Sequence, residues 1–303
     1  MSGFLTDENC IAQREFVGIP AWHEAGYLGE GVNVFCDDAG GSHAESVADI
    51  FRVGLPKANV YTGHINYNGE FSINCKETKE YNVPFDEFVE KYKIKIINNS
   101  VKDKPNVEGI YTEEAIAMKE KIKEHNLLFF GAAGNSNYCP TNQKYNGACI
   151  MVTSCHLQDG EIIETTRSIG NNIDFAMFRG FQSGTSFSSP FLGILGGLLA
   201  SRNIDITQEE VYEYLKSRCV DLYEKGEDIY SGWGLPIMEE PKTIIKLTIG
   251  SSIVSVDGVQ STIDTAPIID KNNRTLVPVR FISEALGCEV GWDDKTKTVT
   301  ITR

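Results

Sequence analysis

The 303-residue chain has no apolar run long enough to cross a bilayer. Its longest, from Phe191 to Ala200, is about half of the roughly 20 residues that a spanning helix needs. The start of the chain also lacks the basic and apolar segments of a secretory signal. These absences argue against a membrane-spanning helix and predict a chain that is cytoplasmic or exported by a route other than Sec.

Paired cysteines and abundant histidines are missing as well. The 8 cysteines are scattered without a C-x-x-C pair, and there are only 5 histidines. This pattern argues against a zinc site or a redox motif. Free buried thiols are the simplest interpretation, although an even number also permits disulfides in an exported chain. We expect no metal and no other cofactor.

Basic residues are scarce, with 28 Lys and Arg against 42 Asp and Glu, a net charge of −14. A nucleic-acid partner is therefore not expected, because phosphate binding relies on Lys and Arg. The acidity is uneven: residues 241–303 carry a net +1, which leaves −15 for residues 1–240. Solubility is the simplest role for that acidity. With 41% apolar residues the chain can bury a sizeable core, and its length suggests two domains.

Apolar strands alternate with amphipathic helices through the first 240 residues. The expected helices cover 42–51, 112–125 and 208–218, and a helix without a polar face is expected over 185–201. The expected strands cover 31–36, 58–61, 94–98, 127–133 and 149–154. Continuous apolar strands between helices predict an α/β fold of three layers, a parallel sheet with helices on both faces.

The pattern changes at 239–242, which looks like a linker. Beyond it we expect short strands at 244–249, 253–256, 276–279 and 298–302, with one helix at 279–286 that ends at Gly287. Turn residues at 257–258 and 293–294 suggest hairpins. We therefore divide the chain into domains 1–240 and 241–303, the second a small α+β module.

The most specific segment is Ser183-Gly-Thr-Ser-Phe-Ser-Ser-Pro190. It places Ser186 where the buried helix begins, the kind of boundary at which a nucleophilic serine is exposed. A plain Ser/Thr-rich helix cap explains any four of these residues but not the whole string. Ser188 stands where an α/β-hydrolase elbow needs glycine, so an esterase or lipase is disfavoured.

A nucleophilic serine needs a base and a group that orients the base. Asp38 follows the first strand, and His43 begins the next helix, so both face the crevice at the carboxyl ends of the strands. Asp37 is the adjacent alternative, but the following Ala-Gly favours Asp38. We expect His64 in a surface loop. Asn135 ends a small-residue strand, where its amide can donate to an oxyanion.

In the order Asp, His, Asn, Ser these residues resemble the subtilisin-like serine proteases, from about Val17 to Leu235. Further matches are Gly18–Val34, Gly54–Tyr61, Ile97–Ser100 and Tyr230–Leu235. The resemblance implies that Asp38 orients His43, that His43 is the base, that Ser186 attacks and that Asn135 donates to the oxyanion. The substrate-binding residues that it implies are Ser100, Val101, Lys102 and Gly134.

The chain departs from this family in three ways. Only four residues separate Asp38 from His43, a short loop in which Gly40 and Gly41 permit a tight turn. Calcium-binding loops are not recognisable. The substrate strand carries Val101 and Lys102 where the family often has glycine. If Lys102 faces the cleft, we expect preference for an acidic residue two to four positions before the cut; alternatively, Lys102 points to solvent.

The C-terminal module, Ile263–Thr302, resembles the copper amine oxidase N-terminal-like domain. The matching segments are Ala266–Ile269, Arg274–Arg280, Glu284–Gly287 and Gly291–Asp293. The module has no histidine and one cysteine, so copper would lack its usual ligands. It is a candidate surface for a binding partner.

The sequence thus predicts a subtilisin-like serine endopeptidase that acts on protein or peptide substrates. The alternative is a catalytically silent chain of the same fold that binds or assembles with other proteins.

Overall fold

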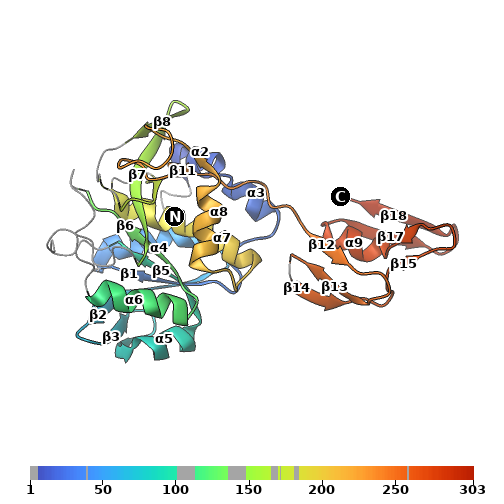
Figure 1. The fold of residues 1–303 in the computed structure, drawn as a ribbon, viewed down its shortest axis with the longest axis horizontal. Coiled ribbons are helices and arrows are strands. Elements are labelled where there is room, and N and C mark those ends of the chain that lie inside the picture. Colours follow the sequence, from blue (N-terminus) through green and yellow to red (C-terminus); the bar gives the residue numbers. More distant parts are fainter. Residues whose placement is uncertain are drawn as a thin grey trace. The chain divides into compact units, whose positions relative to one another are not determined.

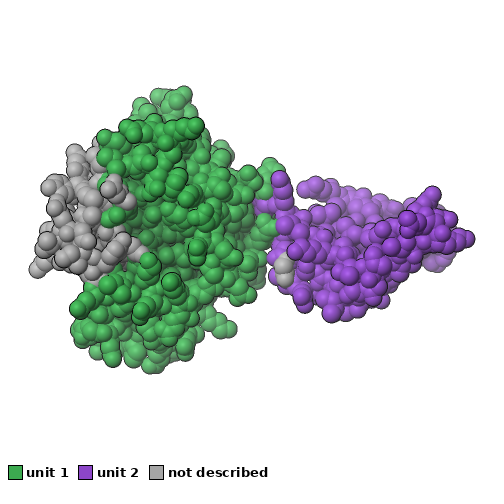
Figure 2. All heavy atoms as spheres, viewed as in Figure 1, with its two compact units in different colours: residues 1–240 green, residues 241–303 purple. Residues whose placement is uncertain are grey.

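The computed structural model describes residues 6–38, 40–100, 113–135, 148–164, 170, 172–180, 184–257 and 259–303. The chain forms two compact units, residues 1–240 and residues 241–303 (Figure 2). Among the described residues, no helix is both long and apolar enough to span a bilayer.

The first unit is built on a nine-stranded sheet with the order β4-β3-β2-β1-β5-β6-β7-β8, in which β9 also pairs with β7 (Figure 1). β1, β2, β5, β6, β7 and β9 are joined by parallel pairings, and β3, β4 and β8 by antiparallel ones. The strands are β1 (Asn33–Asp37), β2 (Asn59–Tyr67), β3 (Phe71–Cys75), β4 (Glu80–Pro84), β5 (Ile94–Asn99), β6 (Leu128–Ala132), β7 (Ile150–Gln158), β8 (Glu161–Glu164) and β9 (Phe175–Phe178).

Helices cover both faces of this sheet. They are α2 (Glu8–Phe16), α3 (Ile19–Glu24), α4 (Gly41–Gly54), α5 (Phe85–Tyr92), α6 (Glu113–Glu124), α7 (Thr185–Arg202) and α8 (Gln208–Lys216). Successive residues of β1 enter different cores: Val34 packs with α4 and α7 on one face, and Phe35 packs with α5 and α6 on the other. The expected three-layer α/β fold is confirmed.

The long helix α7 packs beside α4 on one face of the sheet. A Cβ at Gly197 would collide with Leu55, and one at Gly196 would collide with the Phe130 ring. These glycines therefore allow the helix to approach its neighbours closely, which offsets their low helix propensity. Apart from Ser186, Ser201 and Arg202, the residues of α7 are buried, as expected for a helix without a polar face.

The sequence analysis did not anticipate three elements between residues 70 and 92. β3 and β4 extend the sheet as an antiparallel hairpin, and α5 then packs on them through Phe85 and Phe88. The expectation of His64 in a surface loop was wrong, because β2 runs on to Tyr67. β3 pairs with the second half of β2, from Gly63 onward.

Gly63 is required by this hairpin. Its φ is not in the left-handed region, but a Cβ there would collide with the Asn74 carbonyl oxygen on β3 and meet the Phe35 ring. We predict that Gly63→Ala destabilises the protein by about 1–3 kcal/mol, the usual cost of overpacking. Urea unfolding followed by circular dichroism measures the change. Gly291→Ala is the matched control, because its nearest neighbour lies 3.8 Å from the added carbon; equal stabilities of the two variants would contradict the prediction.

A short antiparallel pair of β10 (Cys219–Val220) and β11 (Leu235–Pro236) completes the first unit. The second unit contains β12 (Ile245–Leu247), β13 (Ile253–Val256), β14 (Val259–Thr262), β15 (Ile268–Ile269), β16 (Thr275–Leu276), α9 (Val279–Ala285), β17 (Glu289–Asp293) and β18 (Thr298–Thr302). β13 pairs with β14, and β17 with β18, so both expected hairpins are present. Gly287 ends α9 with a φ of 76°, as expected for a C-cap.

Candidate active site

The carboxyl end of β1 brings Asp38 and His43 together. Asp38 directly follows the strand and is only 3% exposed, while its N–H donates to the Gly63 carbonyl at 2.9 Å. His43 lies in the first turn of α4, after Gly40 and Gly41, whose φ values are 91° and 70°. The left-handed backbone at these two glycines permits the tight turn that the short loop needs.

His43 Nδ1 lies 2.7 Å from Asp38 Oδ2, within hydrogen-bonding distance. This hydrogen bond raises the pKa of His43 above its ordinary value, although partial burial opposes the shift. The imidazole side chain is 42% exposed. A buried carboxylate therefore holds one ring nitrogen and leaves the other available on an accessible ring, the arrangement of an oriented base.

Ser186 lies in the first turn of α7, after Gly184, where φ is 128°. Its Oγ donates to the Ser100 carbonyl at 3.2 Å, and Ser100 Oγ donates to the Ser186 carbonyl at 2.9 Å. The neighbouring Phe187 ring has its centroid 5.3 Å from that of His43. The starts of α4 and α7 thus lie side by side, but no hydrogen bond joins Ser186 to His43 between these two described residues.

Buried polar side chains fix the start of α7 on the end of β5. Ser189 Oγ donates to Asn98 Oδ1 at 2.7 Å, and Asn98 Nδ2 donates to Ser100 Oγ at 2.9 Å. Asn98 and Ser189 are fully buried, so these bonds act in a low-dielectric environment. Sequence reasoning placed Ser100 in the site but missed its partner Asn98 and the bond from Ser189 to Asn98.

Asn135 follows β6 and faces the start of α7. Its Oδ1 accepts from the Thr185 N–H at 2.9 Å, and Thr185 Oγ1 also bonds Gly134, donating to its carbonyl at 3.0 Å. With the amide oxygen engaged in this way, the amide nitrogen is the group that can donate to a ligand. Gly134 has a φ of 95°. Val101 and Lys102, the other expected substrate-binding residues, lie outside the described residues.

The alternative aspartate, Asp37, has a histidine of its own. It is fully buried, and its Oδ1 lies 3.0 Å from His64 Nδ1 on β2. Sequence reasoning could not find this pair, since the contact depends on the register between β1 and β2. The doubled Asp37-Asp38 at the end of a buried strand was the available signal.

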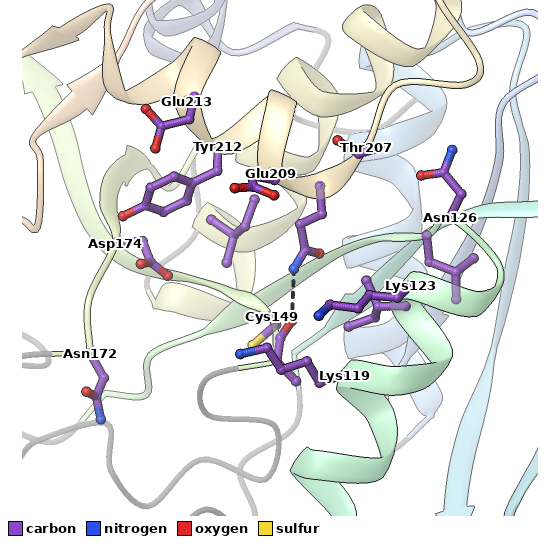
Figure 3. Close-up of a pocket in the computed structure, with 15 residues that line it drawn as sticks. Lys119, Lys123, Asn126, Cys149, Asn172, Asp174, Thr207, Glu209, Tyr212 and Glu213 are labelled. Atoms are coloured by element: carbon purple, nitrogen blue, oxygen red, sulfur yellow. Dashed lines mark hydrogen bonds between the residues drawn. The ribbon is translucent and has the colours of Figure 1, made fainter.

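A pocket of about 740 Å³ lies elsewhere, at the amino ends of β6 and β7 (Figure 3). These strand ends form the edge of the sheet opposite to Asp38 and Asn135, so this pocket is separate from the candidate active site. Figure 3 shows Asp174 beside the Tyr212 hydroxyl. Gln208 Nε2 donates to the Ala148 carbonyl at 3.0 Å. Burial raises the pKa of Asp174 to about 7 and that of Tyr212 to about 12.

Asp86, Glu124 and His125 place potential metal-ligand atoms within 4.8 Å of one another. Lys121 already lies among them: its Nζ donates to Asp86 at 2.6 Å and to Glu124 at 2.9 Å. This cluster contains its own cation, and we assign no metal to it.

The cysteines in the described part of the chain are free thiols: Cys10, Cys36, Cys75, Cys149, Cys155, Cys219 and Cys288. The first five of these are buried. Burial raises the pKa of the Cys36 and Cys149 thiols, which keeps them protonated and unreactive.

Solved structures with the same fold are proteases. The prenylagaramide maturation protease PagA matches with a TM-score of 0.56 and 14% identity, over 72% of this chain and 95% of that one. MycP1, a serine protease and component of a type VII secretion system, matches without its propeptide with a TM-score of 0.52 and 12% identity, over 74% of this chain and 94% of that one. Fervidolysin from Fervidobacterium pennivorans, a keratinolytic enzyme related to subtilisin, matches with a TM-score of 0.50 and 14% identity, over 75% of this chain and 44% of that one.

The sequence itself gives a match to one family model, described as copper amine oxidase N-terminal domain, over residues 237–301. No curated protein matches the sequence significantly. The first unit therefore has the fold of the subtilisin-like proteases, and the second matches the family model described as copper amine oxidase N-terminal domain.

Proposed function

We propose that the protein is a serine endopeptidase in which Ser186, His43 and Asp38 form the catalytic triad. The observation that carries the proposal is the 2.7 Å contact between Asp38 and His43 beside the start of α7. The protease fold of the first unit supports it. Substrates are proteins or peptides, and the acidic surface and the residues at the site favour neither nucleic acid nor a metal cofactor.

In this mechanism Ser186 Oγ attacks the carbonyl carbon of the scissile peptide bond. His43 accepts the hydroxyl proton on Nε2, while Asp38 holds Nδ1–H and stabilises the imidazolium. Asn135 donates to the oxyanion through its amide nitrogen, since its oxygen is bound by the Thr185 N–H. His43 then gives the proton to the leaving amine, and water hydrolyses the acyl-enzyme by the same steps.

The hydroxyl of Ser186 must leave the Ser100 carbonyl before it can donate to His43. Catalytic hydrogen bonds are often unformed without substrate and tighten in the Michaelis complex. The same observation favours the second candidate function, a silent chain of protease fold that binds or assembles with partners, because there the serine would never engage its base.

A fluorophosphonate probe distinguishes these two functions, because it reacts with a serine only where a base activates it. We expect wild-type protein to gain the probe at Ser186, located by mass spectrometry, and Ser186→Ala to gain none. A peptide library incubated with the wild type should yield cleaved products. Absence of both labelling and cleavage would favour the binding function.

Removal of the second unit is predicted to leave hydrolysis of a short peptide nearly unchanged. The residues of the proposed triad all belong to the first unit, and the two units are compact in themselves. A chain that ends at Lys242 should show a kcat/KM within about twofold of that of the full chain. Loss of soluble, folded protein on truncation would refute this independence.

A further inference from the structure

His64 and Asp37 form a second aspartate–histidine pair at the edge of the sheet that carries the proposed triad. His64 Nδ1 lies 3.0 Å from Asp37 Oδ1, and the imidazole side chain is 42% exposed whereas Asp37 is fully buried. A buried carboxylate again lies beside an accessible imidazole, here through a close contact and not through the hydrogen bond that joins Asp38 and His43. The mechanism above does not use it.

Hydrogen bonds to both of its oxygens fix the position of the Asp37 carboxyl group. Its Oδ1 accepts from the Ile65 N–H at 2.9 Å, and its Oδ2 accepts from Asn99 Nδ2 at 2.7 Å. A carboxylate in contact with an imidazole favours the protonated form of the ring. When it is protonated, the half-exposed His64 presents a positive charge beside this buried carboxylate.

Several charged groups on the neighbouring elements, among the described residues, already have partners. Lys76, after β3, pairs with Glu45 of α4. Glu77 accepts from both the N–H and the Oγ1 of Thr62, at 2.7 and 2.8 Å. Asp38 is bound to His43. The first unit as a whole is strongly acidic and therefore repels anionic groups. A local positive charge at this edge would offset that repulsion.

The position of His64 suits a substrate side chain a few residues from the cut. β2, which carries His64, is separated from β5 by β1 alone, and β5 ends at the contact between Ser100 and Ser186. Two strand spacings of about 4.8 Å amount to roughly 10 Å, and an extended peptide advances about 3.3 Å per residue. His64 is thus about three residues from the scissile bond.

We propose that His64, supported by Asp37, is a specificity residue that selects substrates with an acidic side chain two to four residues from the cleaved bond. This inference rests on the proposed peptidase function and names its substrate class. The selection strengthens as the pH falls and His64 is protonated. Lys102, whose charge persists over the same pH range, would give a preference that does not change with pH.

The test measures binding in the full-length Ser186→Ala chain, so that it needs no catalysis. The fluorescent peptides are based on a cleavage site mapped in the library screen, or on the consensus of the library peptides that bind. Glu or Gln is placed in turn at each of the three positions on either side of that site. Each peptide is titrated between pH 5.5 and 8.5. At pH 5.5 we expect Glu to bind about three- to fivefold more tightly than Gln at one position, and this ratio to fall toward one at pH 8.5.

Two substitutions at His64 separate its charge from its shape. Added to Ser186→Ala, His64→Gln should bring the ratio to one at every pH, whereas His64→Lys should keep the preference and remove its pH dependence. His125→Gln is the matched control, because it removes an imidazole that lies 2.8 Å from Asp86 and away from this edge. Circular dichroism confirms that each variant is folded.

A ratio that His64→Gln leaves unchanged but Lys102→Ala abolishes would assign the selection to Lys102 and overturn the proposal. A ratio of one throughout, or failure of both peptides to bind, would overturn it as well. Wild-type labelling by the fluorophosphonate probe reports separately on the peptidase function. A labelled enzyme without acidic preference refutes only the role of His64, and an unlabelled chain that binds Glu peptides refutes only the catalysis.

Discussion

Ser186→Ala and His43→Ala are each expected to lower kcat/KM for a peptide substrate by about 10⁴- to 10⁶-fold, and the double variant no further. The reason is that nucleophile and base act as one unit: a base has nothing to activate once the hydroxyl is gone. The size and the non-additivity are known from subtilisin itself, a protein of the same fold. The measurement is steady-state hydrolysis of a fluorogenic peptide found in the library screen.

His125→Ala is the control for this prediction, since it removes an imidazole that contacts an aspartate outside the proposed site. His125 lies on the α5 and α6 side of the sheet and should tolerate the change. If His43→Ala retained activity while His64→Ala lost it, the base would be His64, oriented by Asp37. Our assignment of the triad would then be wrong.

The local parts of the candidate site could be predicted because each is encoded in a few adjacent residues. An apolar strand that ends in Asp38, two glycines and a helix starting at His43 specify a βα turn without reference to the rest of the chain. The segment around Ser186 likewise specifies a helix start by its own composition. Their meeting at one edge follows from the rule that parallel strands present their carboxyl ends together.

The contacts between strands could not be predicted in the same way. In the sequence, Gly63 is typical of a turn. In the structure it lies in a strand, where a larger residue would collide with the Asn74 carbonyl oxygen of the neighbouring strand. The position of His64 in β2 follows from that pairing. Its contact with Asp37 requires the β1–β2 register, in which Asp37 lies opposite Gly63. Neither requirement leaves a periodic pattern in the sequence.

Asp174→Asn is expected to change how stability depends on pH. Asp174 Oδ2 accepts from the Met151 N–H at 2.6 Å, yet burial in the wall of the pocket raises the carboxyl pKa to about 7. The unfolded chain has an ordinary value near 3.9. The folded state thus binds this proton more tightly, so the stabilisation is complete below about pH 4 and is lost as the pH rises to 7.

The folded and unfolded pKa values of Asp174 differ by about 3 units. At 1.36 kcal/mol per unit, the wild type loses roughly 4 kcal/mol of stability over this pH range. Asparagine keeps an oxygen for the Met151 N–H but does not titrate. The free energy of unfolding of Asp174→Asn relative to the wild type should therefore rise by up to this amount between pH 4 and 7 and level off above. Urea unfolding at four pH values measures the difference. Glu213→Gln is the control, because it removes a carboxylate at the same pocket. If the difference in unfolding free energy between Asp174→Asn and the wild type stayed constant with pH, the carboxyl group of Asp174 would titrate normally in the folded protein.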